Sequence, residues 1–570
     1  MSEGQRAAVP AAIAVSVVLF ALRMDLAARV GFGDAEALYA CYAFHPQPAY
    51  LDHPGLVGVL FRWLSHDAPA APKTVHHFTA LLSTLLPWLG VVAARATGAT
   101  WPGALRTFFA FALLPEMAIG LFALTPDVPL AVAWTSALAF AALALTSPPG
   151  SRTSLATSIA AGFAAGLAVQ SKASGLLLAP AIALAFASRG GRAHLRSAGP
   201  WCGLVVFLIL VWPLAAWEHA EGYPLLRHRL FDTQHEAGFS LLNLGKFAGG
   251  QLLYVTPPFL YAAYVVFRET LRRDDPVDRL LVLAAGLPGI GLALLSLWSR
   301  VAEPHWIAPA YLSLGLAAAR SNDLGLRFQR VVAGTGAAVA VLAFFAVRTP
   351  LVAKVSGDRY VPRYDLTNDL YTWQVALPLV EEEVMAARAQ SRKPVVVGPH
   401  WMICAQVLAG LGPGVPVGCR TKTGDDFERW LPPSEWEKSP TILYVRDDRF
   451  PEDIARLFAD RDIVDVRSTK LYRGGKATRT VQVYRLERTG LGHGGTSAPR
   501  GSLARPLPPP ASGGLASLAG RADVPFVAAD YSAADAADAT EGASAVSPAA
   551  LRSSLSPSGP GFGVVRRRSP

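Results

Sequence analysis

The sequence predicts a polytopic α-helical membrane protein with a small extracytoplasmic α/β domain and a disordered C-terminal tail. The chain has 570 residues, of which 52% are hydrophobic and only 16% are charged. Soluble globular chains carry about a quarter of charged residues, so this composition is typical of a membrane protein. Long apolar runs fill residues 1–348, whereas strand and helix signals alternate over 349–489. These observations divide the chain into a transmembrane domain, an α/β domain and a tail.

The apolar runs of the first domain are expected to form about eleven membrane-spanning helices, each of which needs about 20 residues. The runs lie near 7–30, 75–94, 104–124, 128–146, 155–170, 174–188, 198–217, 248–267, 280–298, 305–320 and 329–347. No clear small-residue cleavage site follows the first run, so we expect an uncleaved first span rather than a secretory signal.

Basic residues predict the orientation of these spans, because arginine and lysine are enriched in cytoplasmic loops. Arginines gather in alternate loops, at 95 and 106, 152, 189–196, 268–273 and 320–330. The N-terminus is therefore expected in the cytoplasm, and the loops 31–74, 125–127, 170–172, 218–247, 299–304 and everything after 348 outside it. This placement also accounts for the net charge of +10 without nucleic-acid binding. We expect a multi-pass protein of the cytoplasmic membrane.

The region after residue 348 changes in character. Residues 393–398, 441–445 and 480–485 are expected to be strands, and 370–390, 402–410 and 451–460 helical. Their alternation predicts the α/β domain. Cys404 and Cys419 fall there, where a disulfide is permitted, and the sequence leaves their pairing open. Residues 490–570 are rich in Gly, Ala, Ser and Pro and are expected to be disordered.

Two carboxylates, Asp34 and Glu36, directly follow the first span. Carboxylates beside lipid are costly to hold and point to function. Either residue could accept a proton from an attacking hydroxyl group as a general base. Alternatively, they cap a helix of the loop, which is a common place for aspartate.

Asp52 and His53 lie in a second polar turn of the same loop. Pro54 would fix this turn, and Asp52 would then satisfy backbone groups. His53 could instead bind a divalent metal with Asp34 or Glu36, although so few scattered ligands are a weak metal signature. We therefore expect no tightly held metal and no certain cofactor, with a divalent ion left possible.

Further polar residues occur between later spans. Asp127 would cap the helix after it, which does not exclude a functional role. Lys172 is a single lysine between two apolar runs; it would either hold an anion such as phosphate or extend its ammonium group to the membrane interface. Arg227 and Arg229 belong to a mixed-charge loop and could grip a phosphate or diphosphate. His305 begins a later span beside Trp306.

In their order and spacing, these segments resemble the GT-C glycosyltransferases of the protein O-mannosyltransferase and lipid A aminoarabinose-transferase type. The resemblance covers residues 7 to about 350. It is carried by 34–39 (DAEALY), 50–55 (YLDHPG), 124–130 (LTPDVPL), 166–172 (GLAVQSK), 249–251 (GGQ) and 305–311 (HWIAPAY). Residues 420–430 loosely resemble an outer-domain stretch of the family, with Phe427 in place of a tyrosine. Ala35 stands where the family has its catalytic aspartate, so either Asp34 or Glu36 would take that role, and we favour Asp34.

The resemblance implies an inverting transfer of a sugar from a polyprenyl-phosphate-linked donor to an acceptor hydroxyl at the outer face of the cytoplasmic membrane. The acceptor would be a lipid, a glycan or a protein. Lys172 with Arg227 or Arg229 would stabilise the departing lipid phosphate, and Asp52, His53, Asp127 and His305 would contact the substrates. Two alternatives remain at this point: an inactive relative that binds a lipid-linked glycan, and a lipid or solute transporter. A transporter is disfavoured by the lack of a convincing internal repeat.

Overall fold

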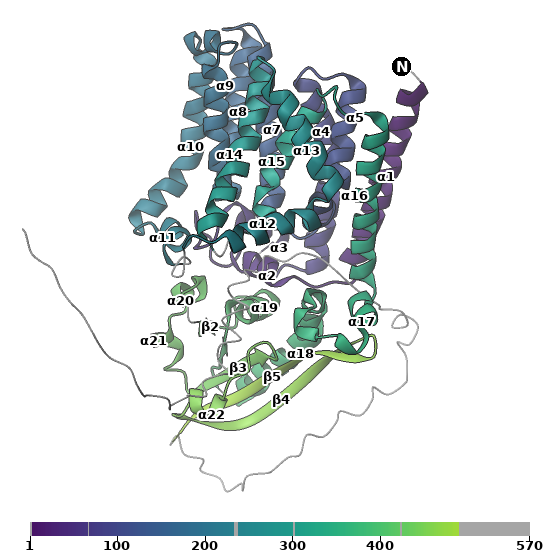
Figure 1. The fold of residues 1–570 in the computed structure, drawn as a ribbon. Helices are drawn as coiled ribbons and strands as arrows, with labels where there is room; N and C mark the ends of the chain where they lie inside the picture. Colours follow the sequence, from purple (N-terminus) through teal and green to yellow (C-terminus); the bar gives the residue numbers. More distant parts are fainter. Residues whose placement is uncertain are drawn as a thin grey trace, which may run out of the picture.

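The computed structural model describes residues 3–66, 68–232, 238–299, 303–390, 392–421 and 424–489. The tail predicted over 490–570 lies outside these residues. Figure 1 shows a bundle of helices above a smaller unit built on a sheet, with the N-terminus at the end of the bundle farthest from the sheet.

Helices make up the whole of the upper part. They are α1 (Glu3–Ala27), α2 (Asp34–Cys41), α3 (Leu56–Ser65), α4 (Pro72–Ala96), α5 (Trp101–Leu113), α6 (Pro115–Gly120), α7 (Asp127–Thr146), α8 (Arg152–Ser171), η1 (Ala173–Leu177), α9 (Leu178–Ala187), η2 (Arg192–Arg196), α10 (Ala198–Ala220), α11 (Pro224–Leu230), α12 (Leu241–Tyr254), α13 (Pro257–Leu271), α14 (Pro276–Trp298), η4 (Pro304–Ile307), α15 (Ala308–Ala318) and α16 (Leu326–Arg348).

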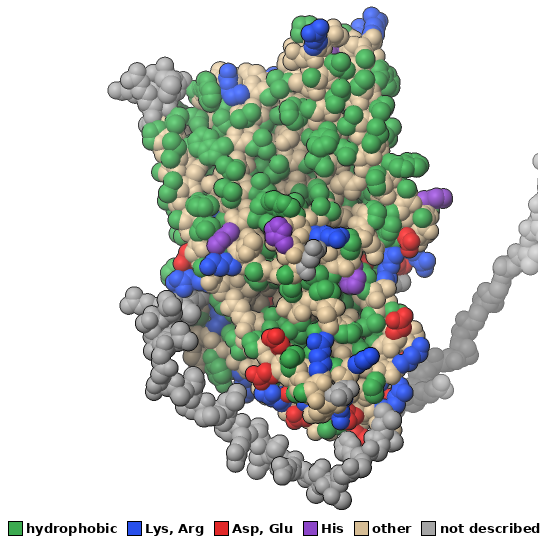
Figure 2. Space-filling model, turned by 180° about the vertical axis from the view of Figure 1, so that it is seen from behind, with side chains coloured by type: hydrophobic (Ala, Val, Ile, Leu, Met, Phe, Trp, Pro, Cys, Tyr) green, Lys and Arg blue, Asp and Glu red, His purple; other side chains and the backbone are tan. Residues whose placement is uncertain are grey.

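In the described part of the chain, seven helices are long and apolar enough to cross a membrane: the segment 8–27 of α1, and α4, α7, α8, α10, α14 and α16. Figure 2 shows apolar side chains over most of the bundle, whereas acidic and basic side chains gather in the lower part around the sheet unit, and basic side chains lie at the opposite tip. A surface of this kind faces lipid rather than water. The protein is therefore a multi-pass membrane protein.

Two predicted spans are broken in the structure. The apolar run 104–124 divides into α5 and α6 at Pro115, and the run 248–267 divides into α12 and α13 before Pro257. Proline lacks a backbone N–H and clashes with the preceding turn, so it ends a helix at such a position. Thr256, at the second break, has a φ of 74°. A hydropathy profile stays apolar across such a break, so each run was expected to be one continuous span.

The mixed-charge segment 218–247, expected as a loop, is largely helical where it is described. Helix α10 continues to Ala220, and α11 follows almost at once. Glu218 accepts the backbone N–H groups of Leu225 and Leu226, which lie in the first turn of α11. Ser240 caps α12 by accepting the N–H of Asn243. A carboxylate that the sequence assigned to a solvated loop thus holds a helix start in place.

The sheet unit contains five strands in the order β2-β1-β3-β5-β4. Strand β1 pairs in parallel with β2 and β3, while β5 is antiparallel to β3 and β4. The elements are α17 (Leu351–Ser356), η5 (Gly357–Arg359), η6 (Pro362–Tyr364), η7 (Leu366–Asn368), α18 (Asp369–Ala389), β1 (Val395–Gly398), α19 (Trp401–Leu411), β2 (Val417–Cys419), α20 (Asp426–Trp430), α21 (Pro433–Trp436), β3 (Thr441–Asp447), α22 (Ile454–Leu457), β4 (Arg461–Arg473) and β5 (Lys476–Arg488).

All three predicted strands are confirmed, and so are the helices at 370–390 and 402–410. The helix expected at 451–460 is only the short α22, because β4 begins at Arg461. Cys404 and Cys419 are buried free thiols whose sulfur atoms lie 2.8 Å apart.

Helix α19 connects the two parts of the molecule, because it packs against α2 at the lower end of the bundle (Figure 1). Gln406 of α19 donates to the carbonyl of Phe32 at 2.9 Å, and the Cys41 thiol donates to the carbonyl of Ala405 at 3.4 Å. Both contacts join the loop 31–74, here called the acidic loop, to the sheet unit. The loop is therefore enclosed between bundle and sheet.

Candidate active site

The two acidic residues of the first loop lie on the short helix α2. Asp34 is its first residue, and both Asp34 and Glu36 are only 2% exposed. The N-cap is Gly33, and no side chain caps the helix, so the alternative that these carboxylates are caps is not supported. Residues two apart on a helix point in different directions. Asp34 and Glu36 accordingly contact different parts of the molecule.

Asp34 faces the sheet unit. Its carboxylate accepts a hydrogen bond from Gln406 at 3.0 Å and forms an ion pair with Nη1 of Arg449 at 2.6 Å. Arg449 follows β3 and also contacts Asp447 at 2.7 Å and Asp369 at 3.5 Å. The arginine therefore joins three acidic residues.

The pKa values of two of these acids, Asp369 and Asp447, are shifted in opposite directions. Burial raises the pKa of Asp369, beyond what Arg479 and Arg449 offset. Burial acts on Asp447 as well, but the positive charges of Arg449 and Arg479 and the hydrogen bonds from Arg449 hold its pKa below the usual value.

Glu36 faces the bundle. One carboxylate oxygen lies 2.9 Å from Nε2 of His76 on α4, and the other accepts the backbone N–H of Leu124 at 2.7 Å. The His76 ring is enclosed by Phe32 and Phe122, at centroid distances of 5.9 and 4.6 Å. Glu36 therefore fixes α2 to the segment that leads into Asp127.

Asp52 is brought together with Arg229 of α11. Nη2 of Arg229 lies 2.9 Å from the Asp52 carboxylate and also donates to the Asp52 carbonyl at 3.0 Å. The guanidinium lies over the ring of Trp306 at 5.8 Å. His228 is 3.8 Å from the same carboxylate, and burial lowers its pKa although Asp52 opposes the shift. Three segments far apart in sequence thus meet at Asp52.

Asp127 and Lys172 form a second ion pair, in which the lysine is buried and the aspartate is partly buried. Nζ of Lys172 donates to both carboxylate oxygens of Asp127 at 2.9 Å, and Lys172 is 6% exposed. Its ammonium group therefore does not extend to the interface, which was the alternative explanation of this lysine. Asp127 is the first residue of α7, and no side-chain cap is formed there.

Other polar contacts connect these pairs. Tyr311 of α15 donates its hydroxyl to Gln251 at 2.9 Å, and Gln251 donates to the carbonyl of Pro304 at 2.8 Å. Pro304 precedes His305, whose ring lies 6.4 Å from that of Tyr254, and Trp306, which contacts Arg229. His305 is thus the sequence neighbour of Trp306, whose ring lies beneath the Arg229 guanidinium.

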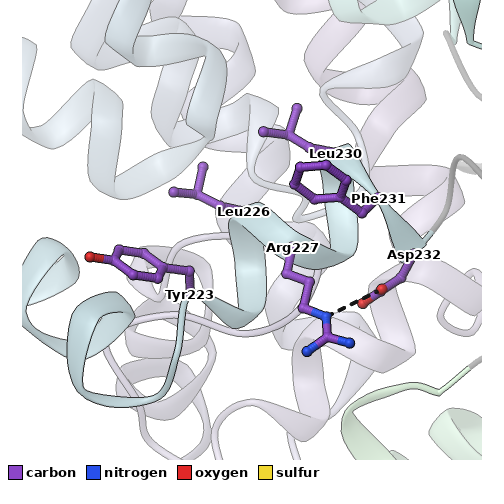
Figure 3. A pocket seen from close by; sticks show the side chains of 6 residues that line it. All are labelled: Tyr223, Leu226, Arg227, Leu230, Phe231 and Asp232. Carbon is purple, nitrogen blue, oxygen red and sulfur yellow. Dashed lines mark ion pairs between the residues drawn. The ribbon is translucent and has the colours of Figure 1, made fainter.

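Arg227 and Arg229 lie two residues apart on α11, so their side chains point in different directions. The Arg227 side chain is largely exposed and pairs with Asp232 at 3.6 Å. Figure 3 shows it at a hollow of about 610 Å³ that is otherwise lined mainly by Tyr223, Leu226, Leu230 and Phe231. The two arginines therefore contact different carboxylates.

His53 is buried, with its ring 5.5 Å from that of Tyr39. Within the described ranges, no group of three or more His, Cys, Asp or Glu side chains is arranged to hold a metal ion. The carboxylates of the loop have the partners named above instead.

The stretch 420–430 contacts the acidic loop from below. Asp426 of α20 accepts the N–H of Leu51 at 3.2 Å and the hydroxyl of Tyr42 at 3.4 Å. Burial, together with the nearby Asp52, raises the pKa of Asp426 to about 7. Trp430 stacks on His45 with a centroid distance of 4.2 Å.

Sequence reasoning missed several residues of the site. His76 and Glu116 fall inside apolar runs that were interpreted only as spans, and Arg449 and Gln406 lie in the α/β region. The histidine pair 76–77 at the start of one apolar run and the single glutamate at 116 within another were the signals that could have revealed the first two. Arg449 and Gln406 gave no comparable signal.

Comparisons with known proteins agree with this architecture. A family model described as dolichyl-phosphate-mannose-protein mannosyltransferase matches residues 52–217. The fold is similar to crystal structures of ArnT from Cupriavidus metallidurans, bound to undecaprenyl phosphate and in the apo state. The TM-score is 0.53 in both cases, with 15% and 16% sequence identity, and the match covers 84% of this chain and 97% of the other. No curated protein sequence matches the chain.

At this level of identity, the structural likeness shows the fold. The resemblance inferred from the sequence is confirmed, and the structure has an ArnT-like GT-C fold.

Proposed function

We propose that this protein is an inverting glycosyltransferase that moves a hexosyl or pentosyl group from a polyprenyl-phosphate donor to an acceptor hydroxyl. The observation that carries the proposal is the assembly, in an ArnT-like fold, of α2, the Asp127–Lys172 pair and the Asp52–Arg229 pair at one end of the bundle. Catalysis of this reaction needs a base for the acceptor and positive charge for the departing phosphate. All of these residue types are present there.

The proposed topology has eleven passes, with the N-terminus in the cytoplasm and the sheet unit outside the cytoplasmic membrane. The shorter helices α5, α9, α13 and α15 would then cross together with the seven longer ones. In Figure 1, the N-terminus and the sheet unit lie at opposite ends of the bundle, which supports an odd number of passes. The α/β domain over 349–489 would thus cover the outer end of the bundle.

In the proposed mechanism, Asp34 is the base. The acceptor oxygen attacks the anomeric carbon of the donor, its proton passes to the Asp34 carboxylate, and the bond from that carbon to the phosphate oxygen breaks. Gln406 and Arg449 hold Asp34 in place, whereas Glu36 positions α2 through His76 and Leu124. Attack from the face opposite the phosphate inverts the anomeric carbon.

Lys172 and Arg229 are proposed to stabilise the departing phosphate. Each already has a carboxylate partner, yet each has further N–H donors: Lys172 uses two of its three on Asp127, and a guanidinium has five. Negative charge on the phosphate grows as the bond breaks, so donors held in place before the reaction favour the transition state. A polyprenyl phosphate is then released as such, without protonation.

The test is transfer by the purified full-length protein in liposomes, from radiolabelled undecaprenyl-phosphate sugars to membrane lipids and proteins of its own cells. We expect Asp34→Asn to reduce the rate constant for transfer by about 10²- to 10⁴-fold, as for loss of a general base. Glu36→Gln keeps an oxygen for the Leu124 N–H and should lose less. If both variants retain full activity, the assigned base is wrong. If the wild-type protein transfers no sugar from any donor, the proposed function fails.

A further inference from the structure

Glu116 is a buried acid that the mechanism above does not use. It lies on α6, is 8% exposed, and neither of its carboxyl oxygens has a hydrogen-bond partner among the described residues. The carboxylates of Asp34, Glu36, Asp52 and Asp127 all have partners within 3.0 Å. Glu116 is therefore the exception among the acids of the site.

An arrangement of this kind costs stability. A buried polar group without a hydrogen-bond partner disfavours the folded state, and more so if it is charged. Native proteins rarely retain such groups unless a ligand, a water molecule or a function accounts for them. The position of Glu116 indicates which of these applies.

Glu116 lies beside the residues proposed to bind the donor phosphate. Asp127 and Lys172 are the charged groups close enough to act on it electrostatically, and Glu116 acts in turn on the hydroxyl of Tyr311. Lys172 directs two of its N–H groups to Asp127, and Tyr311 donates to Gln251. None of these neighbours donates a hydrogen bond to Glu116.

The chemistry of the donor decides what can complete this site. Of its three parts, the polyprenyl chain has no hydrogen-bonding group, and the phosphate already meets Lys172 and Arg229 in the proposed mechanism. The sugar offers several hydroxyl groups, each of which can donate to a carboxyl oxygen and accept from a carboxyl O–H, so it can provide partners for both oxygens of Glu116. The sugar is also attached directly to the phosphate that Lys172 is proposed to hold.

We propose that Glu116 binds the sugar of the donor by accepting hydrogen bonds from its hydroxyl groups. This assignment rests on the proposed function, and it makes Glu116 a specificity-determining residue of the donor site. An acid without a partner destabilises the ligand-free protein, and the bound sugar removes this destabilisation by forming hydrogen bonds with it.

The test compares undecaprenyl phosphate with and without an attached sugar. Full-length protein in nanodiscs is titrated with undecaprenyl phosphate and with undecaprenyl phosphate carrying arabinose, mannose, glucose or galactose. For the sugar that binds the wild type best, Glu116→Ala should weaken affinity about tenfold or more, as expected for the loss of at least one buried hydrogen bond. Affinity for undecaprenyl phosphate itself should change less than about twofold. Glu381→Gln, at an exposed position of α18, is the matched control.

Thermal unfolding separates this role from a structural one. Removal of a buried acid without partners should leave the melting temperature of the ligand-free protein unchanged or raise it, in Glu116→Gln as in Glu116→Ala. The assignment is overturned if either variant melts well below wild type, if both ligands lose affinity equally, or if the sugar adds no affinity in the wild type. If the wild type binds neither undecaprenyl phosphate nor its sugars, the proposed function fails, and this assignment with it.

Discussion

Two buried charged clusters lie near the same end of the bundle and differ in how completely their charges are paired. The domain-contact cluster consists of Asp34, Asp369, Asp447, Arg449 and Arg479. Each of its acids lies within 3.5 Å of an arginine nitrogen. The bundle cluster consists of Glu116, Asp127, Lys172 and Tyr311. Its one cation, Lys172, donates two hydrogen bonds to Asp127, whereas Glu116 has no hydrogen bond among the described residues.

This difference distinguishes a cluster that holds the bundle and the sheet unit together from a cluster that is proposed to bind the donor. Buried charges that are paired and hydrogen-bonded keep two parts of a protein in one geometry, whereas an acid without a partner leaves room for a ligand to supply one. The proposed base Asp34 belongs to the first cluster and is positioned by it. The donor-binding groups belong to the second.

Loss of Arg449 should have the largest effect on stability. Arg449→Ala leaves Asp34 and Asp447 buried without their main partner, which we expect to lower the free energy of unfolding by about 3–5 kcal/mol. Arg456→Ala, an exposed arginine of α22, is the control. Thermal unfolding in detergent measures the effect, and equal melting temperatures for the two variants would contradict the holding role. Binding of undecaprenyl phosphate should persist at temperatures where the variant is folded.

Loss of the cation of the bundle cluster should reduce phosphate binding as well as stability, unlike loss of Arg449. Lys172→Met leaves Asp127 unpaired and should destabilise the protein by a similar or slightly smaller amount, about 3 kcal/mol. The double variant Lys172→Met/Asp127→Leu replaces the pair by apolar groups and should recover most of this loss. Neither variant should bind undecaprenyl phosphate as wild type does, as measured by titration. Recovery of binding together with stability would show that Lys172 does not contact the phosphate.

A smaller effect is expected from pH at the contact between α20 and the acidic loop. The raised pKa of Asp426, about 7, means that its proton is bound more tightly in the folded than in the unfolded chain. Its contribution to stability is therefore greatest at low pH and is lost as pH rises from about 4 through 7.

Asp426→Asn removes this titration and keeps an oxygen for the Leu51 N–H. Its melting temperature relative to wild type should rise by a few degrees between pH 5 and pH 8. A difference that is constant over this range would mean that Asp426 is ionised throughout and belongs with the paired acids of the domain-contact cluster.

The class of fold could be predicted because hydropathy and strand patterns are local signals. The spans around α4, α7, α14 and α16 and the strands β1, β3 and β5 all produce such patterns. The short β2 gave no comparable signal. Strand β4 was missed because its sequence, RDIVDVRSTKLYR, is rich in charged and polar residues.

The site was predictable only in part. The residue types at 34, 36, 52, 127 and 172 could be identified as unusual, but not their partners. Asp127 and Lys172 are 45 residues apart, and Asp52 and Arg229 are 177 apart, so pairing depends on how helices pack. Glu116 was hidden because one acid within an apolar run scarcely changes its hydropathy.

The contact between Asp34 and Arg449 spans 415 residues of chain. During synthesis, the acidic loop is made with the first span, yet its partners Gln406 and Arg449 emerge only after the whole bundle. Closing so long a loop is entropically costly and follows the folding of the segments between. A nascent or truncated chain ending near residue 350 would carry the helices but an open acidic loop, so the site becomes complete only when nearly the entire described chain has been made.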